Sequence, residues 1–142
     1  MGDNIITVYK NECFSIDIYK EFINCITFSG IFSKDSKSCL NDFYKAVDIC
    51  LEKKEKFALI FDTRNIKSMP PIDLIAGLLN KIKKHSDELD KYLICTCILV
   101  NSFGKVLMNF VFCMYTPKLP FIVEKELEVG LKFIFNTKNS EA

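Results

Sequence analysis

Residues 57–79 read FALIFDTRNIKSMPPIDLIAGLL, and this stretch decides the fold that the sequence predicts. Its first part, Phe57 to Phe61, is a short continuous apolar run that ends at Asp62, which is typical of a strand buried on both faces. Thr63 to Met69 is polar and irregular. Pro70-Pro71 then opens a helix, because proline lacks only an N–H that the first helical turn leaves unused. A strand, a loop and a helix are therefore expected in succession.

The chain beyond residue 79 repeats this order. A second continuous apolar run, Tyr92 to Val100, predicts a second central strand. Parallel strands need crossover connections, which helices usually supply. The other elements expected downstream are a helix from Phe103 to Tyr115 capped by Asn101 or Ser102, a brief strand from Pro120 to Val123, a helix from Glu124 to Phe135 and a frayed tail over residues 136–142.

Three segments before residue 57 predict an antiparallel start to the sheet. Ile5 to Tyr9 is an expected edge strand, and Glu12 to Tyr19 and Phe22 to Phe28 alternate in the manner of paired strands. A helix with regularly spaced apolar residues is expected from Cys39 to about Glu55. The predicted fold class is α/β. One domain, residues 1–142, holds a mixed central sheet with an N-terminal antiparallel hairpin, followed by alternating helices and parallel strands.

Charge and cysteine content limit the partners and the compartment. The formal net charge of +1 gives no electrostatic reason to expect nucleic acid or an anionic membrane as a partner. Seven cysteines lie mostly in apolar patterns, and the first residues lack the basic and apolar segments of a secretory signal. We therefore expect a cytoplasmic protein. The longest uncharged apolar stretch, Val106 to Tyr115, is too short to span a bilayer.

The sequence contains no signature of catalysis, a cofactor or a metal. His85 lies on a polar stretch between the second helix and the strand at Tyr92, and as the only histidine it leaves no choice of base for a catalytic triad. Cys95 and Cys97 would face the same side of a strand about 7 Å apart, too far for a disulfide, and lack further ligands at metal-binding spacing. Glycine-rich phosphate loops are missing too. We expect a protein that is not an enzyme.

The element order, together with FDTRNIKSMPPIDL at residues 61–74, resembles the STAS domain of bacterial anti-sigma-factor antagonists and sulfate-transporter tails. In that family a buried strand ends in Asp, a short loop follows, and a helix begins at a Ser or Thr that is phosphorylated in many members. Asp62 and the apolar Ile66 match this pattern, whereas residues 70–72 carry no hydroxyl group. The resemblance implies a regulatory module that binds another protein, without the family's phosphorylatable residue.

The second half of the chain offers an alternative. LICTCILVNSFGKVLMNFVFCMYTPKLP, residues 93–120, resembles the CRAL-TRIO lipid-binding domain, in which a central strand runs through an Asn- or Pro-containing turn into an aromatic helix. This resemblance implies a small protein that binds a lipid or another hydrophobic ligand.

Asp62 and Arg64 form the first candidate contact site, because open α/β sheets place their ligands at the carboxyl ends of strands. In one interpretation Arg64, the sole arginine, contacts an anion or a partner and is oriented by Asp62. In the other, Asp62 caps the loop and Arg64 is merely solvated. Asn65 and Ser68 belong to the same predicted contact loop.

The expected helix from Phe103 to Tyr115 is a second candidate, because it is apolar nearly all round. A helix without a polar face must be covered by its own chain, by a second subunit, or by a lipid or protein partner. Residues outside its expected core stripe, among them Met108, Phe112 and Tyr115, are the predicted contacts. That stripe consists of Phe103, Val106, Leu107, Phe110, Val111 and Met114.

Overall fold

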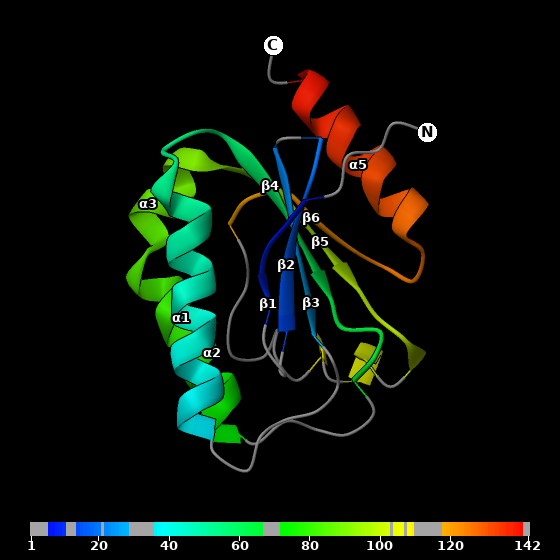
Figure 1. Cartoon of the computed structure of the whole chain (residues 1–142). Coiled ribbons are helices and arrows are strands. Elements are labelled where there is room, and N and C mark those ends of the chain that lie inside the picture. Colours follow the sequence, from blue (N-terminus) through cyan, green and yellow to red (C-terminus); the bar gives the residue numbers. More distant parts are fainter. Residues whose placement is uncertain are drawn as a thin grey trace.

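A computed structural model describes residues 6–10, 14–20, 22–28, 36–66, 72–102, 104–106, 108–109 and 118–140 of the chain. Six strands form one sheet, with helices on both of its faces (Figure 1). Residues 102, 104–106 and 108–109 are also helical. The labelled elements are β1 (Ile6–Lys10), β2 (Phe14–Tyr19), β3 (Ile23–Phe28), α1 (Ser36–Glu52), β4 (Phe57–Asp62), α2 (Ile72–Lys84), α3 (Ser86–Tyr92), β5 (Leu93–Leu99), β6 (Phe121–Glu124) and α5 (Leu127–Ser140).

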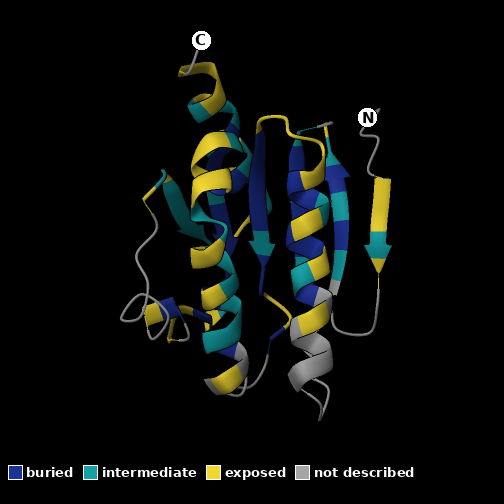
Figure 2. Ribbon diagram, turned by 90° about the vertical axis from the view of Figure 1, so that its left-hand side faces the viewer, coloured by how far each residue is buried: buried dark blue, intermediate teal, exposed yellow. Residues whose placement is uncertain are grey.

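The strands lie in the sheet in the order in which they occur in the chain, from β1 at one edge to β6 at the other. The pairs β1–β2 and β2–β3 are antiparallel, whereas β3–β4, β4–β5 and β5–β6 are parallel. This arrangement confirms the predicted α/β fold class. The two apolar runs become β4 and β5, which are neighbours inside the sheet, and Figure 2 shows buried residues concentrated in the central strands.

Helices α1, α2 and α3 lie together on one side of the sheet, here named the first face (Figure 1). Crossovers between parallel strands are right-handed, so crossovers that join strands in sequential order must all place their helices on the same face. The core under these helices includes Ile16, Ile26, Phe43, Leu59 and Leu89. The first face is therefore the one that the chain connections cover.

The opposite side, named the second face, is covered differently. Only a helix outside the crossovers can reach it, and α5, which follows the last strand, packs there against β5 and β6. Its Ile134 is fully buried in a second core that includes Ile60 and the thiols Cys95 and Cys97. These two cores bury β4 and β5 from both sides, as their apolar sequences predict.

Two predictions about helices are wrong. The polar stretch around His85 contains helix α3, which shows no apolar periodicity because Leu89 is its only buried residue. The tail expected to fray from Asn136 continues α5 to Ser140. Its last turns are held by Phe22, since the Phe135 ring meets the Phe22 ring edge-on at 5.7 Å and Lys138 Nζ lies 4.2 Å from the Phe22 ring centre.

The helix after β5 has a different inward face from the one predicted. Val106, assigned to the core stripe, is 59% exposed, whereas Met108 is buried against Ile98 and Val100. Gly104, one turn before Met108, also lies against the sheet, where a Cβ would come within 2.9 Å of Val100 Cβ. This close approach fixes residues 104 and 108 as the inward positions.

Gly130 gives a test of how α5 packs. An added Cβ at this position would overlap Cys97 Sγ, which is itself fully buried. We expect Gly130→Ala to destabilise the fold by ~1–3 kcal/mol through overpacking, although alanine in a helix interior normally stabilises by ~1 kcal/mol. Urea unfolding followed by circular dichroism measures the change.

Two comparisons check the cause. Glu128→Ala, an exposed substitution on the same helix, should leave the free energy of unfolding nearly unchanged. In a Cys97→Ala background the Gly130→Ala penalty should vanish, because the overlapping sulfur is gone. A stabilising Gly130→Ala would show that α5 does not approach β5 this closely.

Candidate functional site

The loop after β4 begins at Asp62, the last residue of that strand, whose side chain is buried among the ends of parallel strands. Its Oδ1 accepts hydrogen bonds from the Arg64 backbone N–H at 3.1 Å and from Arg64 Nε at 2.9 Å. Its Oδ2 accepts one from Arg64 Nη2 at 2.9 Å. The same carboxylate thus caps the loop and orients the guanidinium. A contact of Arg64 with an anion or a partner stays a prediction.

Arg64 is positioned to make further contacts. Hydrogen bonding to Asp62 raises the pKa of the guanidinium, against a smaller lowering by burial, so the side chain stays cationic. The Arg64 side chain is 39% exposed. A guanidinium carries five N–H groups, of which Asp62 takes two. The remaining N–H groups point in fixed directions, because the bidentate pair holds the side chain in one orientation.

Hydrogen bonds from the next strand hold the loop in place. Thr63 donates from its hydroxyl, at 2.7 Å, and from its backbone N–H, at 2.9 Å, to the carbonyl oxygen of Leu99. Asn101 Nδ2 donates to the carbonyl oxygens of Arg64 at 2.8 Å and of Ile66 at 3.0 Å. The backbone on both sides of the Arg64 side chain is thereby anchored to the end of β5.

Asn101 also fixes the following helix. Its Oδ1 accepts a hydrogen bond from the Gly104 N–H at 2.7 Å, which is the contact of an N-cap residue. The sequence predicts this cap, with Ser102 as the alternative, but not the bonds to the loop. Asn101 therefore belongs to the candidate site as the residue that ties the loop to the helix.

A row of polar residues extends the site across the second face. Thr27 on β3 lies beside Asp62, and Ser15 on β2 lies beside Thr27. Both are partly exposed, and α5 packs on the far strands β5 and β6. We name Ser15, Thr27, Asp62, Arg64 and Asn65 the strand-end surface. The alternating pattern of β2 and β3 signals its outer members, but the sequence does not show the register that joins them to Asp62.

The other predicted contact residues have different outcomes. Asn65 is exposed in the turn beside Arg64. Ser68, Phe112 and Tyr115 lie outside the described residues. Met108 is only 9% exposed and is covered by Ile98 and Val100 of its own chain. Little of its side chain is left for a partner, because the packing of Gly104 against Val100 turns this position inward.

The four cysteines whose side chains the structure describes, Cys25, Cys50, Cys95 and Cys97, are buried free thiols. Burial raises the pKa of Cys25 to about 11 and that of Cys97 to about 12. Among the described residues, no group of three or more His, Cys, Asp or Glu side chains could hold a metal ion. His85 pairs through Nδ1 with Glu88 at 3.0 Å, at the start of α3 and apart from these thiols.

Comparison of the chain with protein-family models, with curated proteins and with solved structures found no match. In the part of the chain that the structure describes, no helix combines the length and the apolar character needed to cross a membrane. The resemblances to the STAS and CRAL-TRIO domains thus rest on the sequence.

The raised thiol pKa values predict slow alkylation of the folded protein. At pH 8 the thiolate fraction of Cys25 should be roughly 100-fold lower than that of an unperturbed thiol, since its pKa rises from 9.0 to about 11. Iodoacetamide labelling followed by peptide mass spectrometry measures the rate, with urea-unfolded protein as the reference. Equal rates in both states would contradict the burial of Cys25.

The same shift predicts how stability depends on pH. A thiol whose pKa is raised by folding stabilises the folded state. This contribution to the free energy of unfolding is fully present below the unfolded pKa of 9.0 and is lost as pH rises toward about 11. Urea unfolding at pH 7 and pH 10 should therefore show lower stability at pH 10.

Two substitutions at Asn101 separate its cap from its loop contacts. Asn101→Ala removes all three hydrogen bonds and should cost ~1–3 kcal/mol. Asn101→Asp keeps the accepting oxygen but loses the amide donor, so the Gly104 amide should stay protected from hydrogen exchange while the loop amides lose protection. Ser102→Ala, an exposed neighbour, is the control. If both Asn101 variants left Gly104 equally unprotected, the assigned cap would be wrong.

Proposed function

We propose that this protein is a non-enzymatic, STAS-like binding module that acts in the cytoplasm through contact with another protein or with a second copy of itself. The strand-end surface, centred on Arg64, would make that contact. The STAS resemblance suggests this class, and the α/β order of the elements agrees with it. The observation that carries the proposal is the Asp62–Arg64 pair, which presents a partly exposed cation in a fixed orientation.

The rigidity of the loop favours recognition. Binding costs less free energy when the contact residues are already held in their bound arrangement. Four hydrogen bonds from Thr63 and Asn101 hold the backbone around Arg64 before any partner arrives. Arginine is also enriched among the residues that dominate protein interfaces.

The charges of the pair indicate the partner's chemistry. Asp62 neutralises Arg64 locally, so the remaining guanidinium N–H groups suit a neutral acceptor such as a backbone carbonyl, or a carboxylate that shares the guanidinium. The neighbouring hydroxyls of Ser15 and Thr27 can donate or accept hydrogen bonds. We infer a polar segment of a partner protein, laid across the ends of β2, β3 and β4.

The same geometry argues against catalysis by Asp62. Both of its carboxylate oxygens accept hydrogen bonds from Arg64, so the group is poorly suited to take a proton from a substrate. Cys25, also on the second face, has a raised pKa and is a weak nucleophile. Neither Asp62 nor Cys25 is therefore well suited to act as a catalytic base or nucleophile beside Arg64.

The CRAL-TRIO resemblance leaves a small lipid- or hydrophobic-ligand-binding protein as the alternative. Native mass spectrometry of protein purified from cells distinguishes the two proposals. The binding-module proposal expects the mass of the chain, alone or as a dimer. The alternative expects the chain with a co-purified lipid.

Substitution of Arg64 tests the proposal directly. Proteins enriched on the immobilised wild-type chain from cell extract should be lost with Arg64→Ala and retained with Lys132→Ala, which removes an exposed cation on α5. Titration calorimetry with such a partner should then show binding at least tenfold weaker for Arg64→Ala. Arg64→Lys should bind the partner almost as weakly as Arg64→Ala, because lysine cannot form the bidentate pair with Asp62.

Three results bear on the outcome. If the partner is a second copy, light scattering should show a dimer that Arg64→Ala converts to monomer. A partner that binds wild type and Arg64→Ala equally well would refute the role of Arg64. Equal losses with Arg64→Ala and Lys132→Ala would point to nonspecific charge effects, and would refute it as well.

A further inference from the structure

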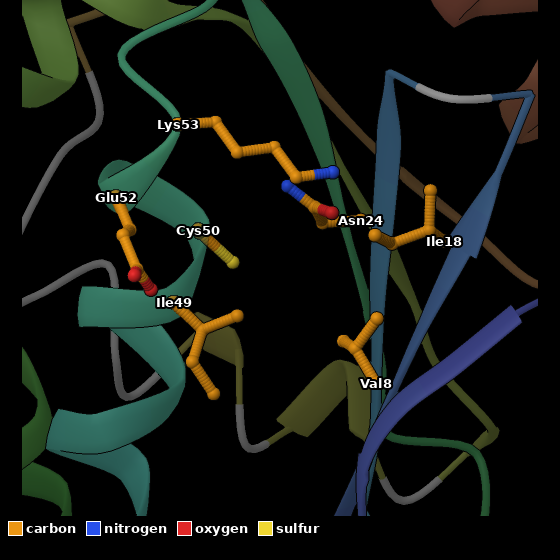
Figure 3. A pocket seen from close by; sticks show the side chains of 7 residues that line it. All are labelled: Val8, Ile18, Asn24, Ile49, Cys50, Glu52 and Lys53. Carbon is orange, nitrogen blue, oxygen red and sulfur yellow. The ribbon is translucent and has the colours of Figure 1, made fainter.

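A pocket of about 400 Å³ lies on the first face, between the last turn of α1 and the strands β1, β2 and β3 (Figure 3). Its volume is within the range of ~300–1,000 Å³ that small-molecule sites occupy. The pocket adjoins the chain segment that enters β4, whereas Arg64 follows the end of β4. The six residues of β4 separate the two places by roughly 20 Å. The pocket is thus independent of the strand-end surface.

The walls of the pocket are apolar. Ile18, Ile49 and Val8 come from three different elements and point toward the same space (Figure 3). Cys50 lies beside them, and burial raises its pKa to about 12, against a smaller lowering by Lys53, so it presents a neutral thiol. Together these side chains can enclose a hydrocarbon group.

A β-bulge in β1 brings Val8 into the pocket. The register between β1 and β2 shifts between Thr7 and Tyr9, so Val8 is the extra residue. Thr7 pairs with Asp17 on the second face, yet Val8 lines a first-face pocket and Tyr9 packs on the first-face core. Two successive residues therefore serve the same face, which is how a bulge redirects a side chain.

One end of the pocket is polar. Asn24 interrupts an otherwise apolar first-face row of β3, and among the described residues its side chain has no hydrogen-bond partner. Lys53 follows α1 and is exposed, with no ion pair in the described part of the chain. Figure 3 shows the Asn24 amide and the Lys53 ammonium converging at this end, while the Glu52 carboxylate points away from Asn24. Asparagine is depleted in strands, and this one places its amide at the polar end of the pocket.

We propose that this pocket binds a small monocarboxylate with an apolar tail. Lys53 and the Asn24 amide would hold the carboxylate, and Val8, Ile18 and Ile49 would enclose the tail. One ammonium group matches one negative charge, and an amide N–H₂ adds a neutral donor. A doubly charged phosphate fits less well, because a single cation faces it.

Octanoate is a suitable probe, with 1-octanol as its uncharged counterpart. Titration monitored by amide resonances in ¹H–¹⁵N NMR should give saturable shifts at Val8, Ile18, Asn24 and Lys53 with octanoate. Binding should weaken about tenfold for Lys53→Gln and for Asn24→Leu, since each loses a charged or charge-assisted contact. Lys56→Gln, which removes a cation exposed three residues further on, should bind like wild type.

The outcomes are separable from those at Arg64. Arg64→Ala should bind octanoate as wild type does, so failure of one proposal leaves the other standing. The pocket proposal is overturned if the shifts do not localise to these residues, if 1-octanol binds as tightly as octanoate, or if Lys53→Gln and Lys56→Gln have equal effects. Dispersed NMR spectra of Lys53→Gln and Asn24→Leu confirm that each remains folded.

Discussion

Burial of β4 and β5 on both faces is the constraint on which the rest of the structure depends. The right-handed crossovers cover only the first face, with α1, α2 and α3. Ile60 and Cys97 point to the second face, and their side chains would be exposed to water without α5, which packs over β5 and β6. Because α5 covers the far strands, the strand ends around Asp62 carry polar side chains. The candidate site thus occupies the part of the second face that α5 leaves uncovered.

The central sheet could be predicted because its signal is strong and local. Two uninterrupted apolar runs gave β4 and β5, and alternation gave β2 and β3. Helix α3 left no comparable signal, since a helix that buries Leu89 alone has no apolar stripe. The end of α5 depends on Phe22, more than a hundred residues earlier in the chain, and so its order is a tertiary effect.

The candidate site divides in the same way. Asp62 and Arg64 are two residues apart, and their pairing could be anticipated from position alone. The bonds of Asn101 join a side chain to loop carbonyl groups 35 and 37 residues away, and nothing local indicates them. The inward turn of Met108 depends on how closely Gly104 approaches Val100. The shift of register at Val8 likewise becomes visible only when β1 and β2 are paired.

The sequential order of the strands also has a consequence for how the chain acquires its structure. Each strand pairs with the one made just before it, so the sheet can grow by one neighbour at a time. The antiparallel pairs close over short connections, whereas β3–β4, β4–β5 and β5–β6 are parallel and each must close over a longer crossover, which slows folding. Helix α5 follows all six strands in the chain and is the only described helix packed on the second face. Until it docks, the apolar second-face surface of β5 stays exposed, and such a transiently exposed surface is prone to aggregate with other unfolded chains.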